Sequence, residues 1–115
     1  MGLIMSSDSP VKAQFEAYNA HDIEAFMSCF SEDFKGYRMP SELPSTVGKE
    51  SLREFYMNNR FNNPLLRAEL ISRIVMGNKV FDHELIYGLS DQPLESVAVF
   101  EIKNDLISTA WFYFP

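Results

Sequence analysis

The sequence predicts an α+β fold in which three N-terminal helices pack on one face of an antiparallel sheet. Apolar residues recur at helical spacing up to about residue 60; after Pro64 the spacing changes to about two residues and stays there. The chain has 115 residues, enough for one hydrophobic core. We therefore expect a single domain over residues 10–115, preceded by a disordered tail over residues 1–9.

Each expected helix has a start signal and an apolar stripe. The first, over residues 10–20, follows Ser9 as N-cap and has proline at its first position. Asp22 can cap a second helix whose apolar residues fall at i, i+3, i+4 and i+7 and end at Phe30. Helical spacing after Gly48 predicts a third helix to about residue 60.

The expected strands are read from apolar alternation between turn signals. Residues 40–47, with two prolines, form a loop in this reading, and Gly77-Asn78 marks a hairpin turn. Extended segments are expected at residues 34–39, 67–76, 79–87, 96–102 and 106–114.

The last two expected strands are apolar on both faces. Val97 and Val99 share one face, and Trp111 with Tyr113 should lie beside them. An antiparallel sheet with one solvated face normally alternates apolar and polar residues, so this outer face should be covered. We expect a homodimer that packs through these four residues.

Composition limits the function classes. A net charge of −6 without a basic stripe argues against nucleic-acid binding. Cys29 is the only cysteine, so no disulfide within the chain and no zinc cluster of the Cys/His type is expected. We expect a cytoplasmic protein without a membrane span, because the chain has no signal peptide and no apolar stretch of about 20 residues.

Four segments together resemble one superfamily. They are YNAHDIEAF (18–26), FSEDF (30–34), GKESLREFY (48–56) and VAVFEIKNDLI (97–107). Their order and spacing are similar to the nuclear transport factor 2-like superfamily, and specifically to its ketosteroid-isomerase-like and SnoaL-like (polyketide-cyclase-like) branch. The resemblance implies a cone-shaped, cystatin-like arrangement with a curved sheet and an internal pocket for a small molecule. This fold hosts several enzyme activities and non-catalytic binders, so it does not by itself imply a reaction.

The resemblance also implies that the chain is not a ketosteroid isomerase. That enzyme uses an Asp base and an oxyanion hole made of a Tyr and a protonated Asp. The matching positions hold Arg38, Gln14 and Ala98, and only a supporting tyrosine, Tyr56, is kept. Arg38 cannot act as a base near neutral pH.

His83 is the main candidate for chemistry. Alternation places it on the pocket side of strand 79–87, where it would act as general acid or base together with Tyr56 and Arg38. The alternative is a buried core histidine bonded to Tyr56, Gln14 or water. Asp82 and Glu84 then lie on the opposite face, where they pair with Arg67 or Arg73 or join the dimer surface. The remaining residues expected to contact the ligand are Gln14, Ser72, Phe81, Phe100 and Phe112.

Two hypotheses follow for function. The first is an enzyme, working without a cofactor, that isomerises, dehydrates or cyclises a hydrophobic carbonyl compound. The second is a non-catalytic protein that binds an apolar or carboxylated small molecule, and a protein-interaction module that uses the outer sheet face is a third reading. The lack of an Asp or Glu in the expected pocket favours binding, whereas the resemblance favours catalysis.

Overall fold

The computed structural model describes residues 8–115 and confirms the α+β fold. The helices are α1 (Ser9–Ala20), α2 (Ile23–Met27) and α3 (Lys49–Asn59). The strands are β1 (Phe30–Arg38), β2 (Thr46–Val47), β3 (Arg67–Met76), β4 (Lys79–Tyr87), β5 (Leu94–Lys103) and β6 (Leu106–Tyr113). None of the described helices is long and apolar enough to cross a membrane.

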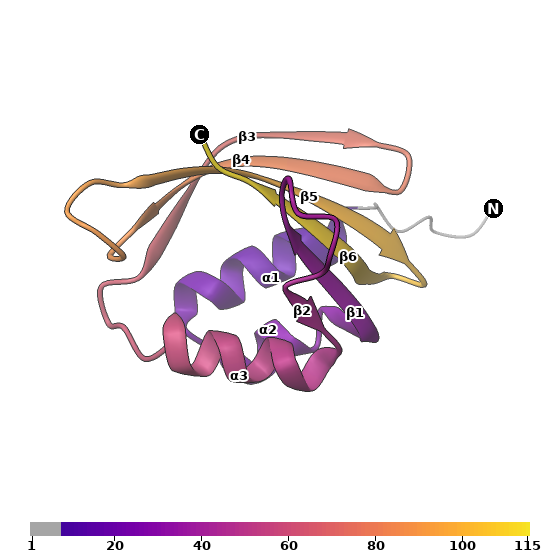
Figure 1. The fold of residues 1–115 in the computed structure, drawn as a ribbon, viewed down its shortest axis with the longest axis horizontal. Coiled ribbons are helices and arrows are strands. Elements are labelled where there is room, and N and C mark those ends of the chain that lie inside the picture. The colour runs from indigo at the N-terminus through magenta and orange to yellow at the C-terminus, as the bar shows by residue number, and fades with distance from the viewer. Residues whose placement is uncertain (1–7) are drawn as a thin grey trace.

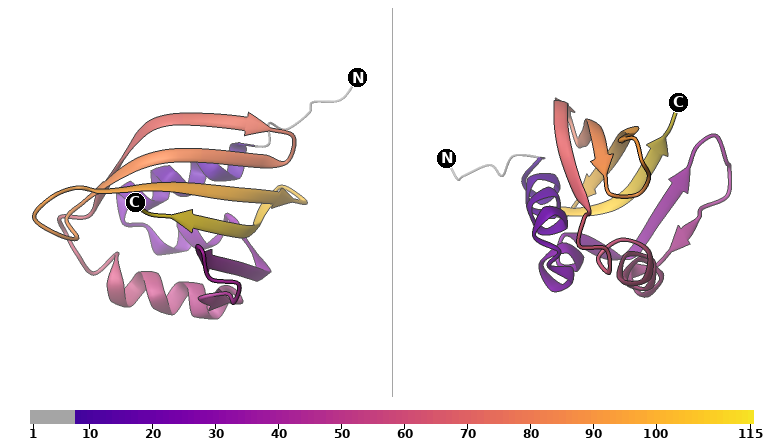
Figure 2. Two further views of the ribbon diagram at one scale, coloured as in Figure 1. Left: turned by 45° about the horizontal axis from the view of Figure 1, so that its top comes forward. Right: turned by 90° about the vertical axis from the view of Figure 1, so that its left-hand side faces the viewer.

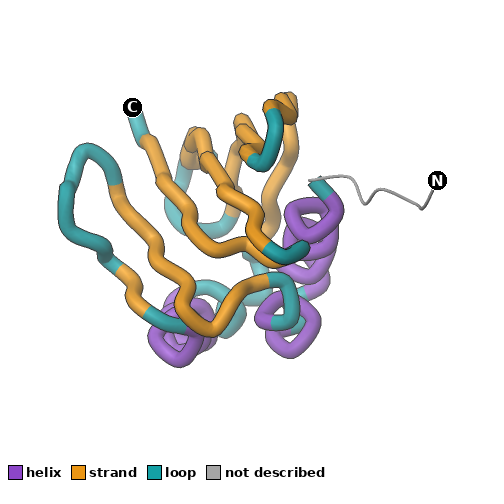
Figure 3. The backbone as a smooth tube through the Cα atoms, turned by 90° about the vertical axis from the view of Figure 1, so that its right-hand side faces the viewer, coloured by secondary structure: helices purple, strands orange, loops and turns teal. Residues whose placement is uncertain are grey.

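The six strands form one sheet in the order β2-β1-β6-β5-β4-β3. All neighbours are antiparallel except β1 and β6, which run parallel. The sheet curves over the three helices, which all lie on the same side of it (Figures 1 and 2). An end-on view shows how far the strands bend around the helices (Figure 3). This curvature gives the sheet an inner face toward the helices and an outer face away from them.

Several boundaries differ from those expected, among them the start of β5 at Leu94 rather than at residue 96. α2 ends at Met27 and β1 begins at Phe30, because Phe30 joins the parallel pairing with Ile107 and the Ile107 N–H donates to the Cys29 carbonyl at 2.9 Å. The short strand β2 lies within the expected loop 40–47. Ser9 is already helical, and the rest of the expected tail, apart from Asp8, lies outside the described residues.

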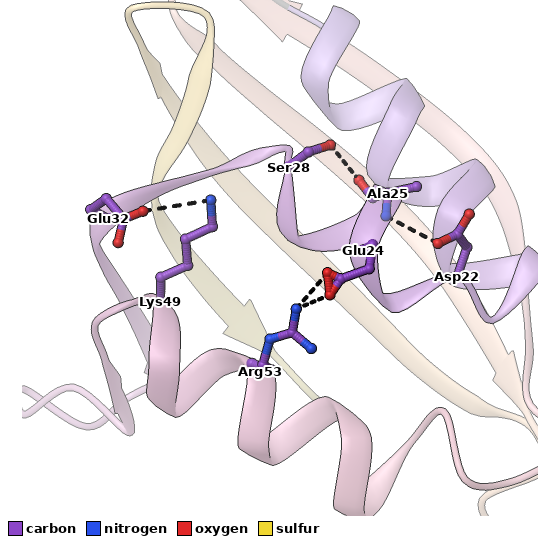
Figure 4. Close-up of polar contacts among 7 residues, drawn as sticks. All are labelled: Asp22, Glu24, Ala25, Ser28, Glu32, Lys49 and Arg53. Carbon is purple, nitrogen blue, oxygen red and sulfur yellow. Dashed lines mark hydrogen bonds and ion pairs between the residues drawn. The ribbon is translucent and has the colours of Figure 1, made fainter.

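The helices are joined to one another by polar contacts at the bottom of the domain. Asp22 caps α2, its Oδ1 accepting from the Ala25 N–H at 3.1 Å. Arg53 of α3 pairs with Glu24 of α2, and Lys49 lies 3.9 Å from Glu32 (Figure 4). The first pair joins α3 to α2 and the second joins α3 to β1; exposed pairs of this kind add little to stability.

Asn19 connects α1 to the start of β3. Its amide donates to the Ala68 carbonyl at 3.0 Å and accepts from the Ala68 N–H at 2.7 Å. Two residues later, His21 Nε2 lies 2.8 Å from the Leu66 carbonyl oxygen. The segment between α1 and α2 therefore fixes where the β3–β4 hairpin begins, and so where β4 crosses the inner face.

The aromatic content forms the core between helices and sheet. Phe26 contacts Phe30, Tyr56 and Phe61 with ring centroids 4.6–5.2 Å apart. Phe26 and Phe34 are both 1% exposed. Large rings of this kind pack a small domain while leaving space where they do not interdigitate.

Candidate functional site

An internal cavity of about 200 Å³ lies between the inner face of the sheet and helices α1 and α3. Most of its wall is apolar and includes Phe15, Phe30, Leu52, Ile86, Phe100 and Phe112. The polar groups on the wall are few, and the chemically active ones are Gln14, Tyr18, Arg38, Tyr56, Arg60 and Glu84. An apolar cavity with a small set of polar groups is the usual form of a small-molecule site.

Glu84 is the acid on this wall. It lies on β4 between Leu70 of β3 and Ser96 of β5, and its side chain faces inward with Val80, Asp82 and Ile86. Burial raises the pKa of Glu84 to about 7; the Asp82 carboxylate adds to the rise and the Arg73 guanidinium opposes it. Near neutral pH this carboxyl can therefore both give and take a proton.

Tyr18 and Tyr56 supply hydroxyl groups to the same cavity. Their rings meet edge to face with centroids 6.3 Å apart. Burial raises the pKa of both, that of Tyr56 to about 12, so both are protonated donors at neutral pH. The Tyr18 hydroxyl is buried, and among the described residues only the Arg60 side chain offers it a hydrogen bond, a weak one outside ordinary geometry. The charge of Arg60 offsets part of the pKa rise of Tyr18.

Asp82 and Arg73 form a buried ion pair beside Glu84. Asp82 is 0% exposed, and Arg73 donates to its two oxygens at 2.7 and 2.8 Å. This pair is one of the alternatives that the sequence left open for Asp82. Among residues 8–115 no cation forms an ion pair with the Glu84 carboxyl itself.

Five residues expected in the pocket do line the cavity: Gln14, Arg38, Tyr56, Phe100 and Phe112. Gln14 is buried, whereas Arg38 is exposed at the end of β1. The Arg38 guanidinium lies 4.2 Å from the centre of the Phe114 ring, a cation–π contact.

The prediction that His83 lies in the pocket is wrong. His83 is on the outer face of the sheet, where its Nε2 lies 2.7 Å from Oε2 of Glu95. Both side chains are partly exposed, at 35% and 51%. His83 is therefore neither an acid or base for the cavity nor the enclosed core histidine of the alternative reading.

Phe81 and Ser72 were also misplaced. Phe81 shares the outer face with His83, since alternate residues of β4 point to opposite sides. Ser72 pairs with His83 in the register that the turn at Gly77-Asn78 sets. A bulge between Leu70 and Ser72 breaks the alternation of β3, so Ser72 faces outward although Leu70, opposite Glu84, faces inward.

Sequence reasoning missed Glu84, Tyr18 and Arg60. The signal for Glu84 was the hairpin register: the turn at Gly77-Asn78 places Arg73 opposite Asp82. A carboxylate that is paired across a hairpin can be buried, and Glu84 then faces inward with it.

A second hollow, between α2 and α3, is a weaker candidate. Both of its cations pair with carboxylates of the hollow, Arg53 with Glu24 and Lys49 with Glu32 (Figure 4). Among residues 8–115, no group of three or more His, Cys, Asp or Glu is placed to hold a metal ion. The internal cavity is thus the candidate site.

A curved sheet packed against three helices is the fold of nuclear transport factor 2-like proteins. Residues 11–110 match the model of the SnoaL-like domain, and the chain belongs to that family. No curated protein matched the sequence.

Solved structures agree on the fold. An uncharacterised cystatin-fold protein from Novosphingobium aromaticivorans is 25% identical with a TM-score of 0.82, over 95% of this chain and 98% of that one. A proposed ketosteroid isomerase from Kribbella flavida is 16% identical with a TM-score of 0.81, over 95% and 77% of the two chains. A proposed polyketide cyclase from Sinorhizobium meliloti is 18% identical with a TM-score of 0.78, over 94% and 99%.

Proposed function

We propose that this protein is an enzyme, working without a cofactor, that moves a proton on a small apolar carbonyl compound held in the cavity. The observation that carries the proposal is the Glu84 carboxyl, which lies in a mostly apolar wall with a pKa of about 7. Isomerisation, dehydration and cyclisation all begin with removal of a proton from the carbon next to a carbonyl group. The relatives named for ketosteroid isomerase and polyketide cyclase act in the same general chemistry, according to those names.

In the proposed mechanism the ionised Glu84 takes the proton, and negative charge develops on the carbonyl oxygen. The Arg60 guanidinium beside the buried Tyr18 hydroxyl can only donate, so the Tyr18 O–H is free to donate a hydrogen bond to that oxygen. Tyr56 is the second donor. Glu84, now protonated, then returns the proton to another atom of the same molecule, so the cycle needs no other reactant.

The proposal excludes ketosteroid isomerisation by the known arrangement of that enzyme. Arg38, at the position of its general base, cannot take up a proton. Gln14 is left to hydrogen-bond the ligand from α1. The base proposed here instead comes from β4.

The test is hydrogen–deuterium exchange of small ketones in D2O, followed by proton NMR. With phenylacetone and cyclohexanone as probes, we expect the protein to speed exchange at the carbons next to the carbonyl. The rate should rise with a midpoint near pH 7, since the active form of Glu84 is the carboxylate. Ketone binding without exchange would instead support the non-catalytic binding protein.

The proposal includes a homodimer, formed in the cytoplasm, through the outer sheet face. Val97 pairs with Tyr113 and Val99 with Trp111, and Tyr37 stacks on Trp111 with ring centroids 6.2 Å apart. Tyr113 is 45% exposed. Apolar and aromatic side chains on the solvent side of three neighbouring strands support burial against a second copy.

Sedimentation equilibrium tests the dimer. We expect twice the chain mass of 13.2 kDa for the wild type and the single mass for Val99→Glu, which places a charge in the interface. Leu43→Glu is the matched control, because Leu43 is 77% exposed and lies in the loop between β1 and β2, outside these strands. A monomeric wild type would contradict the dimer and leave the face to another protein.

A further inference from the structure

We propose that the ligand of the cavity is a single-ring carboxylic acid, whose carboxylate is held by Arg38 at the cavity mouth. The inference rests on the proposed function for the location of the site and adds the chemical class of the molecule. It is carried by the charge pattern, by the geometry of Arg38 and by the size of the cavity.

Two cations on the cavity wall have no acid partner among the residues that the structure describes. Six of the ten lysines and arginines pair with carboxylates of the described residues: Lys12, Lys49, Arg53, Arg73, Lys79 and Lys103. Within residues 8–115, Arg38 and Arg60 have no such partner, and both line the cavity. In a chain of net charge −6, a site with two such arginines and a single acid selects for an anion.

Arg38 is the better placed of the two. Its guanidinium lies over the Phe114 ring. This contact uses one flat face of the guanidinium and leaves the N–H donors at the guanidinium edge free. An edge of this kind fits a carboxylate with two parallel hydrogen bonds. Arg60 also lies over an aromatic ring, that of Phe55, at 5.0 Å from its centre. Its donors are engaged by the Asn59 carbonyl at 2.9 Å and by the Tyr18 hydroxyl, so they are less available to a ligand.

The volume limits the ligand to one ring. A cavity of about 150 Å³ accommodates benzene. At about 200 Å³, this cavity has room for a phenyl ring and a short chain but not for a fused multi-ring skeleton. Phe100 and Phe112, which meet edge to face with centroids 6.4 Å apart, offer the ring an aromatic surface.

The strand order separates the two ends of the site. Arg38 is on β1 and Glu84 on β4, with β6 and β5 between them. Three strand spacings put their backbones about 14 Å apart along the sheet, a gap that two long side chains narrow from both sides. A ligand held by its carboxylate at Arg38 thus presents its other end to Glu84, which keeps the two acids apart.

The test is isothermal titration calorimetry of the full chain with 3-phenylpropionate and its neutral amide at pH 6. We expect the wild type to bind the carboxylate at least about ten-fold more tightly than the amide. Arg38→Gln should remove this preference. Lys35→Gln, an exposed change on the same strand outside the cavity, should keep it.

Each other outcome overturns the proposal. If the amide binds as tightly as the acid, or if Arg38→Gln keeps the preference, the carboxylate is not recognised by Arg38. If Arg60→Gln alone removes it, the anion site belongs to Arg60. If neither probe binds, the single-ring class is wrong, while deuterium exchange on ketones still decides the proposed enzyme function separately. Thermal unfolding of each variant shows that it is folded.

Discussion

Glu84→Gln is expected to lower the rate of proton transfer by about 10²–10⁴-fold, the range typical for loss of a general base. Glutamine has nearly the same shape and can still hydrogen-bond, but it cannot take up a proton. Ligand affinity should therefore change much less than the rate. Deuterium exchange on phenylacetone at saturating ketone measures the rate, and calorimetry with the same ketone measures binding.

His83→Gln is the control for that result, because His83 lies on the other face of the same strand. We expect it to keep the wild-type rate and pH profile. A Glu84→Gln protein with full activity would remove the base from the proposed mechanism. A His83→Gln protein without activity would return the chemistry to the outer face.

The Glu84→Gln variant should be more stable than the wild type at high pH. The pKa of Glu84 is raised from 4.5 in the unfolded chain to about 7 in the folded protein, so folding favours the neutral acid. Between these values the folded state binds more protons, and stability falls as pH rises. Glu84→Gln removes this penalty, which at pH 8 is at most about 3 kcal/mol. Urea unfolding should show the gain at pH 8 and little of it at pH 4.5.

A stabilising change that destroys activity would distinguish a functional carboxyl from a structural one. When a carboxyl that stabilises the fold is replaced, the protein becomes less stable. A carboxyl kept for chemistry instead destabilises the folded state, so its replacement makes the protein more stable. Equal stability of wild type and variant at pH 8 would mean that the Glu84 carboxyl is well solvated. The base would then titrate at an ordinary pKa.

The helices and the four long C-terminal strands could be predicted because each carries its own periodicity. The third helix was expected at 48–60 and occupies Lys49–Asn59, and two strands, β3 and β4, have the expected bounds. The parallel pairing of β1 with β6 joins segments about 75 residues apart, and no local pattern encodes it.

The site could not be predicted in the same way because the sheet is apolar on both faces. On β4 the outer set, with Phe81 and Leu85, is more hydrophobic than the inner set, with Asp82 and Glu84. Assigning the more hydrophobic set of β4 to the inner face therefore gave the wrong orientation of the strand. The pairing with Arg73 across the hairpin makes burial of Asp82 tolerable. The bulge between Leu70 and Ser72 breaks the alternation of β3 that would have indicated this inner face, and a bulge leaves little trace in one sequence.

Of the substitutions proposed, Arg73→Met should lower the free energy of unfolding most, by about 3–5 kcal/mol. Methionine removes the only ion-pair partner of Asp82 in the described part of the chain, and Asp82 is 0% exposed. Its charge must then be buried alone or neutralised by a proton. Urea unfolding at pH 7 measures the loss. Arg53→Met is the matched control: its pair with Glu24 is exposed, so it should cost no more than about 1 kcal/mol.

Two further measurements separate the ion pair from mere packing. The double variant Arg73→Met/Asp82→Leu should recover most of the lost stability, because a buried pair replaced by apolar residues leaves no isolated charge. Arg73→Met should also move the pH midpoint of deuterium exchange upward, since the Arg73 guanidinium opposes the rise in the pKa of Glu84. If Arg73 only stabilised the fold, its replacement would lower stability without moving that midpoint. An unchanged midpoint, with full recovery in the double variant, would confine Arg73 and Asp82 to the fold and leave burial as the main reason for the raised pKa of Glu84.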